Sequence, residues 1–382
     1  MPTISQAVFS CPERFYIRNT GRLENLPIRL NYPLFQTLHI ERFEEMTNPL
    51  STRRKFSIIA VAAITAAIYS AVPAHSETQN SLSIRLGVLK FGTVNWELDV
   101  IKHHELDKHS GLVLDVVGLA NKDATSIALN AGDVDMIVTD WIWTSRQRHA
   151  GADFTFVPYS EAAGSVMVHP NSGIERLEDL RGKVIGVAGS PIDKSWLLLR
   201  AYSYKMIGED LEKITRPAYA APPLLNEKFK QGEFDAVLNY WNYTARLRAA
   251  GMTELIKVQD LLPALGVPGR LPLIGYVFSE SWAEKNIEAV SAFFKASADA
   301  RAIMIESNEE WERLRPLTRA KDDATLAALR HGYREGVPQA YGHEQEEAIR
   351  AAFQIVAEHG GRALVGRSAE LAPGTLWGGE AY

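Results

Sequence analysis

Short apolar runs alternate with helix-compatible stretches from Leu82 onwards, and this alternation constrains the fold more than any other feature of the chain. Ser83–Val88 alternates apolar and polar side chains with a period of two, which predicts a strand. Further strands are predicted at 112–117, 134–139, 183–188, 234–239 and 273–278. Two of the intervening helical patterns end near Gly111 and Gly151, a residue type typical of helix ends. The alternation predicts β-α units around mostly parallel sheets, the α/β class.

A second series of such units begins after Gly173. It includes a helix to about Ile207, for which we expect Ser190 as the N-cap and Pro191 at the first helical position. The remainder of the chain after about residue 306 is expected to be helical, because apolar residues recur there at spacings of three and four. Two series of about 100 residues each, followed by C-terminal helices, predict two similar Rossmann-like lobes.

Composition excludes several classes of protein. The chain has 382 residues, 46% of them hydrophobic, and a formal net charge of −5. These values predict a globular protein without a nucleic-acid partner, since no excess of positive charge is available to neutralise phosphates. The single cysteine, Cys11, excludes an internal disulfide and cysteine-based metal sites. We expect no metal and no other cofactor.

An export signal is predicted well inside the chain. The basic pair Arg53-Arg54 precedes Ser57–Val72, an uncharged stretch of 16 residues, and small residues follow at Ala74 and Ser76. Sixteen residues are fewer than the roughly 20 that span a bilayer, so a cleaved signal is favoured over an anchor. The arginine pair resembles a twin-arginine signal, and an ordinary Sec signal stays an alternative. We expect export to the periplasm, with cleavage near residues 74–76.

The residues ahead of this signal show no clear periodicity. Met46 would make a conventional start, and residues 1–45 are therefore expected to be a mis-annotated, disordered upstream extension, with the signal peptide at 46–76. Residues 1–74 hold 8 Lys or Arg and 5 Asp or Glu, which leaves 33 against 41 for the exported part. Its net charge of about −8 suits a dissolved, monomeric protein.

Three stretches of sequence carry a resemblance to a known family. They are NAGDVDMIVTD at 130–140, LEDLRGKVIGV at 177–187 and QGEFDAV at 231–237. The first and third share one theme, a helix end of the form x-Gly-Asp/Glu-x-Asp that leads into a strand. In order and spacing the chain resembles the type II periplasmic solute-binding proteins of ABC importers, in the nitrate/sulfonate/taurine and thiamine-precursor branch, over residues 82–310.

The resemblance implies two lobes with a central cleft and a hinge. The first lobe would comprise residues 77–168, the second 169–268, and residues 269–382 would return to the first lobe and add C-terminal helices. The crossovers would lie at Gly164–His169 and Gly266–Val277. The resemblance also implies that the protein binds a small organic ligand and delivers it to an ABC permease in the inner membrane.

Ligands of open α/β sheets bind at the carboxyl ends of the strands, so we take the candidate site from those loops and the helix starts that follow. The candidate ligand-binding residues are Asn95, Trp96, Thr125, Ser126, Asp140, Trp141, Ser190, Lys194, Trp196, Asn239, Tyr240 and Trp241. Tryptophan rings in such loops stack on planar ligands or surround an ammonium group, or else they pack the lobes. Trp96 and Trp241 are the first candidates among them.

The polar candidates also have two readings each. Ser190 marks a helix N-terminus that would suit an anion, or serves as an ordinary cap. Asp140 pairs with a ligand amine, or caps the next helix. No arginine lies in the expected loops, and Lys194 is the only nearby cation. We therefore expect an aromatic, uncharged or weakly cationic ligand in preference to a sulfonate.

Enzyme signatures are weak in this sequence. His103, His104 and His109 are taken as part of a solvated helix face, since no acidic residue completes a metal set. Gly186–Ser190 lacks the third glycine of a dinucleotide fingerprint. We expect a binding protein and no enzyme. Two alternatives stay open: a periplasmic sensing or accessory protein without a transporter, and a thiamine-precursor-type enzyme with a pyridoxal substrate, against which the export signal argues.

Overall fold

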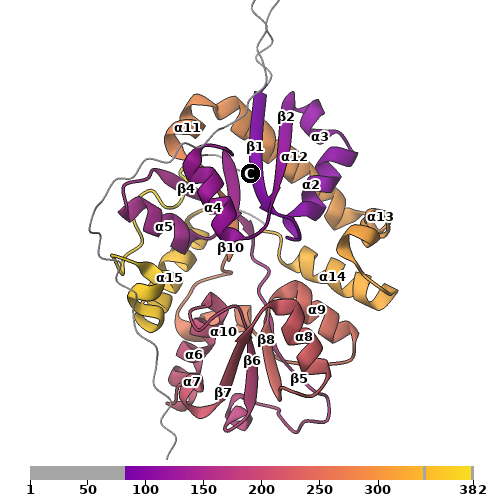
Figure 1. The fold of residues 1–382 in the computed structure, drawn as a ribbon, viewed down its shortest axis with the longest axis vertical. Helices are drawn as coiled ribbons and strands as arrows, with labels where there is room; N and C mark the ends of the chain where they lie inside the picture. Colours follow the sequence, from indigo (N-terminus) through magenta and orange to yellow (C-terminus); the bar gives the residue numbers. More distant parts are fainter. Residues whose placement is uncertain (1–81, 339–340, 380–382) are drawn as a thin grey trace, which may run out of the picture. The chain divides into compact units, whose positions relative to one another are not determined.

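Two five-stranded sheets organise the part of the chain that the structure describes, residues 82–338 and 341–379 (Figure 1). The structure is a computed structural model, and the described residues belong to one compact unit. The predicted upstream extension and signal peptide, residues 1–76, lie outside the described residues. No helix in the described ranges combines the length and the apolar character that crossing a membrane requires.

The first sheet has the strand order β2-β1-β3-β10-β4. Its strands are β1 (Leu82–Leu89), β2 (Leu112–Leu119), β3 (Met136–Thr139), β4 (Phe154–Ser160) and β10 (Ile274–Ser279). β1 runs parallel to both β2 and β3, and β10 runs antiparallel to β3 and β4. β1 keeps the predicted alternation at its start, where Ser83 and Arg85 are exposed and Ile84 is buried, and it is buried from Leu86 to Val88.

The second sheet repeats this topology in the order β7-β6-β8-β5-β9. Its strands are β5 (Ser165–Val168), β6 (Val184–Ala188), β7 (Arg216–Ala220), β8 (Ala236–Asn239) and β9 (Thr253–Lys257). In each sheet three parallel strands are followed by one antiparallel strand, β10 or β5, that the chain reaches by crossing from the other sheet. The predicted two-lobed α/β fold is confirmed.

The chain leaves the first sheet slightly earlier than the sequence suggested. β5 lies within the range assigned to the first lobe, which ended at residue 168, yet it pairs with β8 and β9 of the second sheet. The chain therefore crosses between the sheets at residues 161–164, and it returns at 266–273. The apolar residues of β5 carry no information about the sheet that this strand joins.

Four strands have no counterpart in the sequence prediction: β4, β5, β7 and β9. Three of these are edge strands, namely β4, β7 and β9. Pro158 lies in β4 and Pro217 in β7. Proline is tolerated at a sheet edge because no partner strand needs its missing N–H group, but it weakens the strand signal in a sequence.

Helices cover both faces of each sheet (Figure 1). In the described part of the chain they are α2 (Val94–His103), α3 (Leu106–His109), α4 (Lys122–Ala131), α5 (Trp141–His149), α6 (Lys194–Ile207), α7 (Leu211–Ile214), α8 (Pro222–Lys230), α9 (Trp241–Ala249), α10 (Val258–Leu265), α11 (Glu280–Lys285), α12 (Ile287–Glu306), α13 (Asn308–Thr318), α14 (Asp323–Glu335) and α15 (His343–Val365). The C-terminal region is helical, as expected, and α15 packs on both α5 and α6.

The start of α6 differs from the prediction. Its N-cap is Asp193, whose Oδ1 accepts hydrogen bonds from the backbone N–H groups of Ser195 at 2.9 Å and Trp196 at 3.4 Å. Ser190 lies three residues earlier, in a turn, where its Oγ accepts from the N–H of Ile192. The prediction of Ser190 as N-cap and Pro191 at the first helical position is wrong. A carboxylate is as good a cap as a serine hydroxyl and also complements the helix dipole.

A buried carboxylate joins four elements of the first lobe. Glu97 of α2 is fully buried, and its Oε1 accepts hydrogen bonds from the hydroxyls of Tyr276 at 3.2 Å and Ser297 at 2.5 Å. Its Oε2 accepts from Arg301 Nε at 3.2 Å and from the Tyr333 hydroxyl at 3.1 Å. β10, α12 and α14 are thereby tied to α2. Burial, followed by the charge of Glu97, raises the pKa of Tyr276, so its hydroxyl keeps the proton that it donates.

Replacing Glu97 with leucine is expected to lower the free energy of unfolding by about 3–5 kcal/mol, because the Arg301 guanidinium would stay buried without its carboxylate. Urea denaturation measures this loss. Asp299→Asn serves as the matched control, since it breaks an exposed pair with Lys295 on the same helix and should cost less than about 1 kcal/mol. A similarly small loss for Glu97→Leu would contradict the importance given to the network.

Candidate functional site

An ion pair connects the carboxyl edges of the two sheets. Asp140 follows β3 and caps α5, where its Oδ1 accepts from the N–H of Trp143 at 2.9 Å. Lys194, the first residue of α6 in the second lobe, places its Nζ 2.8 Å from Asp140 Oδ2. Both side chains are largely buried, with exposures of 14% and 15%. A strand end in each lobe thus supplies one partner of a buried contact between the lobes.

Asp193 and Tyr240 extend this contact within the second lobe. The Tyr240 hydroxyl donates to Asp193 Oδ2 at 3.2 Å. Gly189 lies beneath them with a φ of +86°, and a side chain there would begin 3.2 Å from the Tyr240 hydroxyl. Only glycine fits such a backbone without strain. We call Asp140, Asp193, Lys194 and Tyr240 the inter-lobe cluster.

The two carboxylates of the inter-lobe cluster differ in pKa, because nearby positive charges affect them to different extents. Burial on its own would raise the pKa of Asp140, but Lys194, Lys122 and the Trp143 N–H bring it down to about 2. For Asp193 burial prevails, and its pKa is raised despite the charges of Lys194 and Lys122. Within the described ranges, no lysine or arginine forms an ion pair with Asp193, and this explains the difference between the two groups.

Lys122 is the residue that sequence reasoning missed. It is exposed at the first position of α4, and its charge reaches both carboxylates of the inter-lobe cluster. The expectation that Lys194 is the only nearby cation is therefore corrected. The available signal was position: Lys122 follows the carboxyl end of β2 directly after the N-cap Asn121.

The two leading tryptophan candidates contact each other. Trp96 of α2 and Trp241 of α9 meet edge to face, with ring centroids 5.8 Å apart and planes at 83°. Trp96 also packs on Trp311 at 5.9 Å and is only 5% exposed. The structure thus joins one ring from each lobe, and each is engaged by aromatic neighbours. A role for either ring in ligand binding stays a prediction.

Two other tryptophan candidates lie in the core. Trp141 and Trp196 are fully buried. Trp141 Nε1 donates to the carbonyl oxygen of Pro272 at 2.8 Å, which fixes α5 against the returning crossover. Both residues lie in the first turn of a helix, where the side chain turns back onto the sheet.

Thr125 and Ser126 lie inside α4, because this helix begins at Lys122 and not next to them. Thr125 is 2% exposed and donates its hydroxyl to the carbonyl oxygen of Lys122 at 2.8 Å. Ser126 is half-buried. The expectation that they stand at the start of the helix is wrong, since Asn121 is the cap.

Asn95 and Asn239 shape the loops of the site. Asn95 Nδ2 donates to the carbonyl oxygens of Leu89 and Gly92, both at 2.8 Å, and so holds the turn between β1 and α2. Asn239 is 1% exposed, and its Oδ1 accepts from the N–H of Tyr240 at 2.9 Å. This bond holds the backbone from which the Tyr240 side chain extends.

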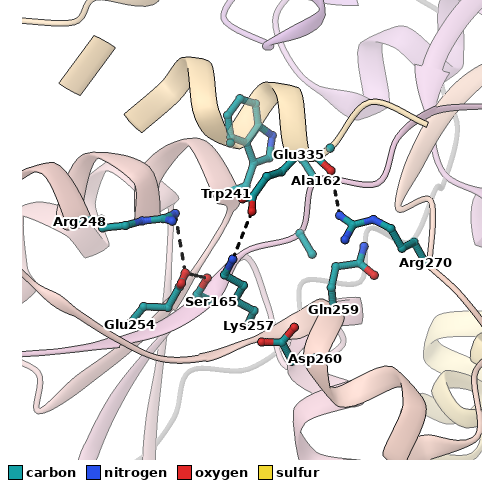
Figure 2. A pocket seen from close by; sticks show the side chains of 13 residues that line it. Ala162, Ser165, Trp241, Arg248, Glu254, Lys257, Gln259, Asp260, Arg270 and Glu335 are labelled. Carbon is teal, nitrogen blue, oxygen red and sulfur yellow. Dashed lines mark hydrogen bonds and ion pairs between the residues drawn. The ribbon is translucent and has the colours of Figure 1, made fainter. Parts of the chain in front are cut away.

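A separate cavity of about 80 Å³ lies beside the crossovers (Figure 2). Its walls carry charged pairs, with Arg248 3.7 Å from Glu254 and Lys257 3.5 Å from Glu335. Trp241 is the only predicted site residue among those that line it. Over the described residues, no group of three or more His, Cys, Asp or Glu side chains is arranged to hold a metal ion.

The Asp140–Lys194 pair predicts a pH dependence of stability. The pKa of Asp140 falls from its usual 3.8 to about 2 in the folded protein. A lowered pKa stabilises the fold above about pH 4, and this contribution, about 2 kcal/mol, is lost as the pH falls towards 2. The difference in unfolding free energy between the wild type and Asp140→Asn should therefore shrink between pH 5 and pH 2.5 in denaturant titrations. A difference independent of pH would contradict the pair.

The sequence of this chain matches a known protein family. Residues 108–311 match the model of the family described as NMT1/THI5 like. This match covers more than half of the 382 residues. None of the curated proteins matches the sequence.

Solved structures of similar fold are periplasmic binding proteins. The aliphatic sulphonate binding protein SsuA of Escherichia coli has 20% sequence identity and a TM-score of 0.61, over 79% of this chain and 94% of that chain. The alkanesulfonate-binding protein SsuA of Xanthomonas axonopodis pv. citri, bound to MOPS, has 18% identity and a TM-score of 0.58, over 78% and 98%. A putative periplasmic sulfonate-binding protein SsuA of Methylobacillus flagellatus has 14% identity and a TM-score of 0.57, over 77% and 91%.

At identities of 14–20%, the similarity to solved structures establishes only the fold of this chain. Its family is established by the match of residues 108–311 to the family model. The resemblance that the sequence motifs carried is confirmed at both levels. The chain belongs to the NMT1/THI5-like family and has the two-lobed fold of the periplasmic binding proteins.

Proposed function

We propose that this protein is the solute-binding component of an ABC transporter, which holds a small organic molecule between its two lobes and delivers it to a membrane permease. The observation that carries the proposal is the inter-lobe cluster. Polar groups from β3–α5 of one lobe and from α6 and α9 of the other meet at the carboxyl edges of the sheets, where ligands of such folds bind.

The crossovers between the sheets supply a hinge for this function. Gln259 of α10 connects them: its Nε2 donates to the carbonyl oxygen of Glu161 in one crossover and to that of Leu271 in the other, at 2.5 and 3.0 Å. Two crossover segments held together in this way can act as the axis about which one lobe rotates relative to the other. Rotation would separate Asp140 from Lys194 and open the site to a ligand.

We further propose that the protein works in the periplasm as a monomer and has no enzymatic step. The basic and apolar residues at 53–76 support export. The solved proteins of similar fold are periplasmic binding proteins by name. We infer an aromatic, uncharged or weakly cationic ligand from the loop composition. We also propose that the rings of Trp96 and Trp241, which contact each other, face this ligand.

Native mass spectrometry on protein purified gently from its own cells tests the proposal. We expect a discrete small-molecule adduct that is lost on denaturation and whose mass identifies the ligand. The same spectrum reports where the chain begins. An unliganded mass, together with no thermal shift from the small molecules extracted from the same cells, would count against the binding function.

Tyr240 provides a variant test of the site. Tyr240→Ala removes the hydroxyl bonded to Asp193 and one wall of the site, so we expect the affinity for the captured ligand to fall about tenfold, or 1.4 kcal/mol. Isothermal titration calorimetry measures the change. Tyr204→Ala is the control, because Tyr204 is a 63% exposed residue on α6 of the same lobe. Equal affinities for the two variants would remove Tyr240 from the site.

A further inference from the structure

We propose that the ligand carries an ammonium group, and that this group binds Asp140 in the place that Lys194 Nζ occupies in the structure. The inference rests on the proposed function, because it names the ligand class of the same site. It assigns Lys194 a specific role, that of a tethered cation which pairs with Asp140 until a ligand displaces it.

The helix N-termini at the site already hold carboxylates. In α/β folds these N-termini bind anions, through free N–H groups and the positive end of the helix dipole. Here Asp140 accepts the N–H of Trp143 at the start of α5, and Asp193 accepts those of Ser195 and Trp196 at the start of α6. A sulfonate or carboxylate approaching either helix would meet a like charge and few free donors.

Lys194 shows how an alkylammonium group fits the site. Its Nζ donates to Asp140 Oδ2 at 2.8 Å, a charge-assisted hydrogen bond in a largely buried setting. Asp193, which accepts the hydrogen bond of the Tyr240 hydroxyl, lies within reach of the Lys194 charge. The four-carbon stem of lysine is flexible, so this group can leave while a ligand ammonium takes its position.

Asp193 is the group that would gain most from an added cation. Its Oδ1 is used by backbone N–H groups and its Oδ2 accepts the neutral hydroxyl of Tyr240. In the parts of the chain that the structure describes, no basic side chain lies within ion-pair distance of it. Burial accordingly raises the pKa of Asp193. Asp193 is partly buried, and a further positive charge in addition to those of Lys194 and Lys122 would relieve part of its desolvation cost.

An anionic ligand would have to use Lys194 and Lys122 instead. Lys194 would then turn from Asp140 to the ligand, and the buried Asp140 carboxylate would lose its partner beside a new negative charge. With an ammonium ligand the same movement of Lys194 is compensated, because the ligand takes over the bond to Asp140. This asymmetry favours a cationic group.

The test uses the full-length protein and two pools of probes. One pool contains primary and quaternary ammonium compounds, and the other contains carboxylates and sulfonates built on the same alkyl and aryl skeletons. Asp140→Asn and Asp193→Asn remove the charges but keep good helix caps. We expect binding from the ammonium pool by calorimetry, weakened at least tenfold by Asp140→Asn and by a smaller factor by Asp193→Asn. Asp322→Asn, the same change at the N-cap of α14, is the control and should leave binding unchanged.

Lys194→Met reverses the sign of the expected effect. Removing the tethered cation should raise the affinity for ammonium probes several-fold, whereas an anionic ligand would lose its partner and bind more weakly. Binding from the carboxylate and sulfonate pool alone overturns the inference and leaves the proposed function standing. No binding from either pool, with no adduct in the native mass spectrum, overturns both. If Lys194→Met does not fold, the two Asn variants and the choice of pool by the wild type still decide.

Discussion

A single buried carboxylate holds together the lobe on which the site is built. Glu97 lies on α2, and its four partners come from β10, α12 and α14, segments that are separated from it by roughly half the chain. A charge in such a place is tolerated only when each oxygen is hydrogen-bonded and a cation lies beside it. Arg301 supplies that cation. The network therefore requires α12 and α14 to pack on the first lobe.

The inter-lobe cluster also contains a largely buried carboxylate that is stabilised by a cation, with one difference from the Glu97 network. Its Asp140–Lys194 pair is also buried, but the two partners belong to different lobes, so the pair can break without unfolding either lobe. The Glu97 network joins elements within one lobe and has no such freedom. The first contact therefore suits a binding site that opens, and the second suits the rigid body against which it opens. The edge-to-face contact of Trp96 with Trp241 also joins the two lobes, and it can therefore break in the same way as the Asp140–Lys194 pair.

Much of the fold could be predicted because most strands are marked by apolar runs or by alternation. β1 was expected from its alternation, and β2, β3, β6, β8 and β10 were expected from apolar runs. β4 and β7 are edge strands that each contain a proline, which weakens the strand pattern in a sequence. The prediction of the candidate site was more uneven. Strand ends correctly indicated Asp140, Lys194 and Tyr240 as neighbours, but they gave no means of distinguishing these from Trp141 and Trp196, which lie in the core.

The sequence by itself determined the class of the fold, the doubled β-α pattern and the positions of the loops between strands, because these follow from local periodicity and from glycine and cap signals. Tertiary structure alone decided which charges meet. Lys122 acts across a gap of more than 70 residues on Asp193, and Lys194 pairs with an aspartate of the other lobe. Electrostatic interactions depend on distance in space and on burial, and neither is encoded in the local spacing of residues.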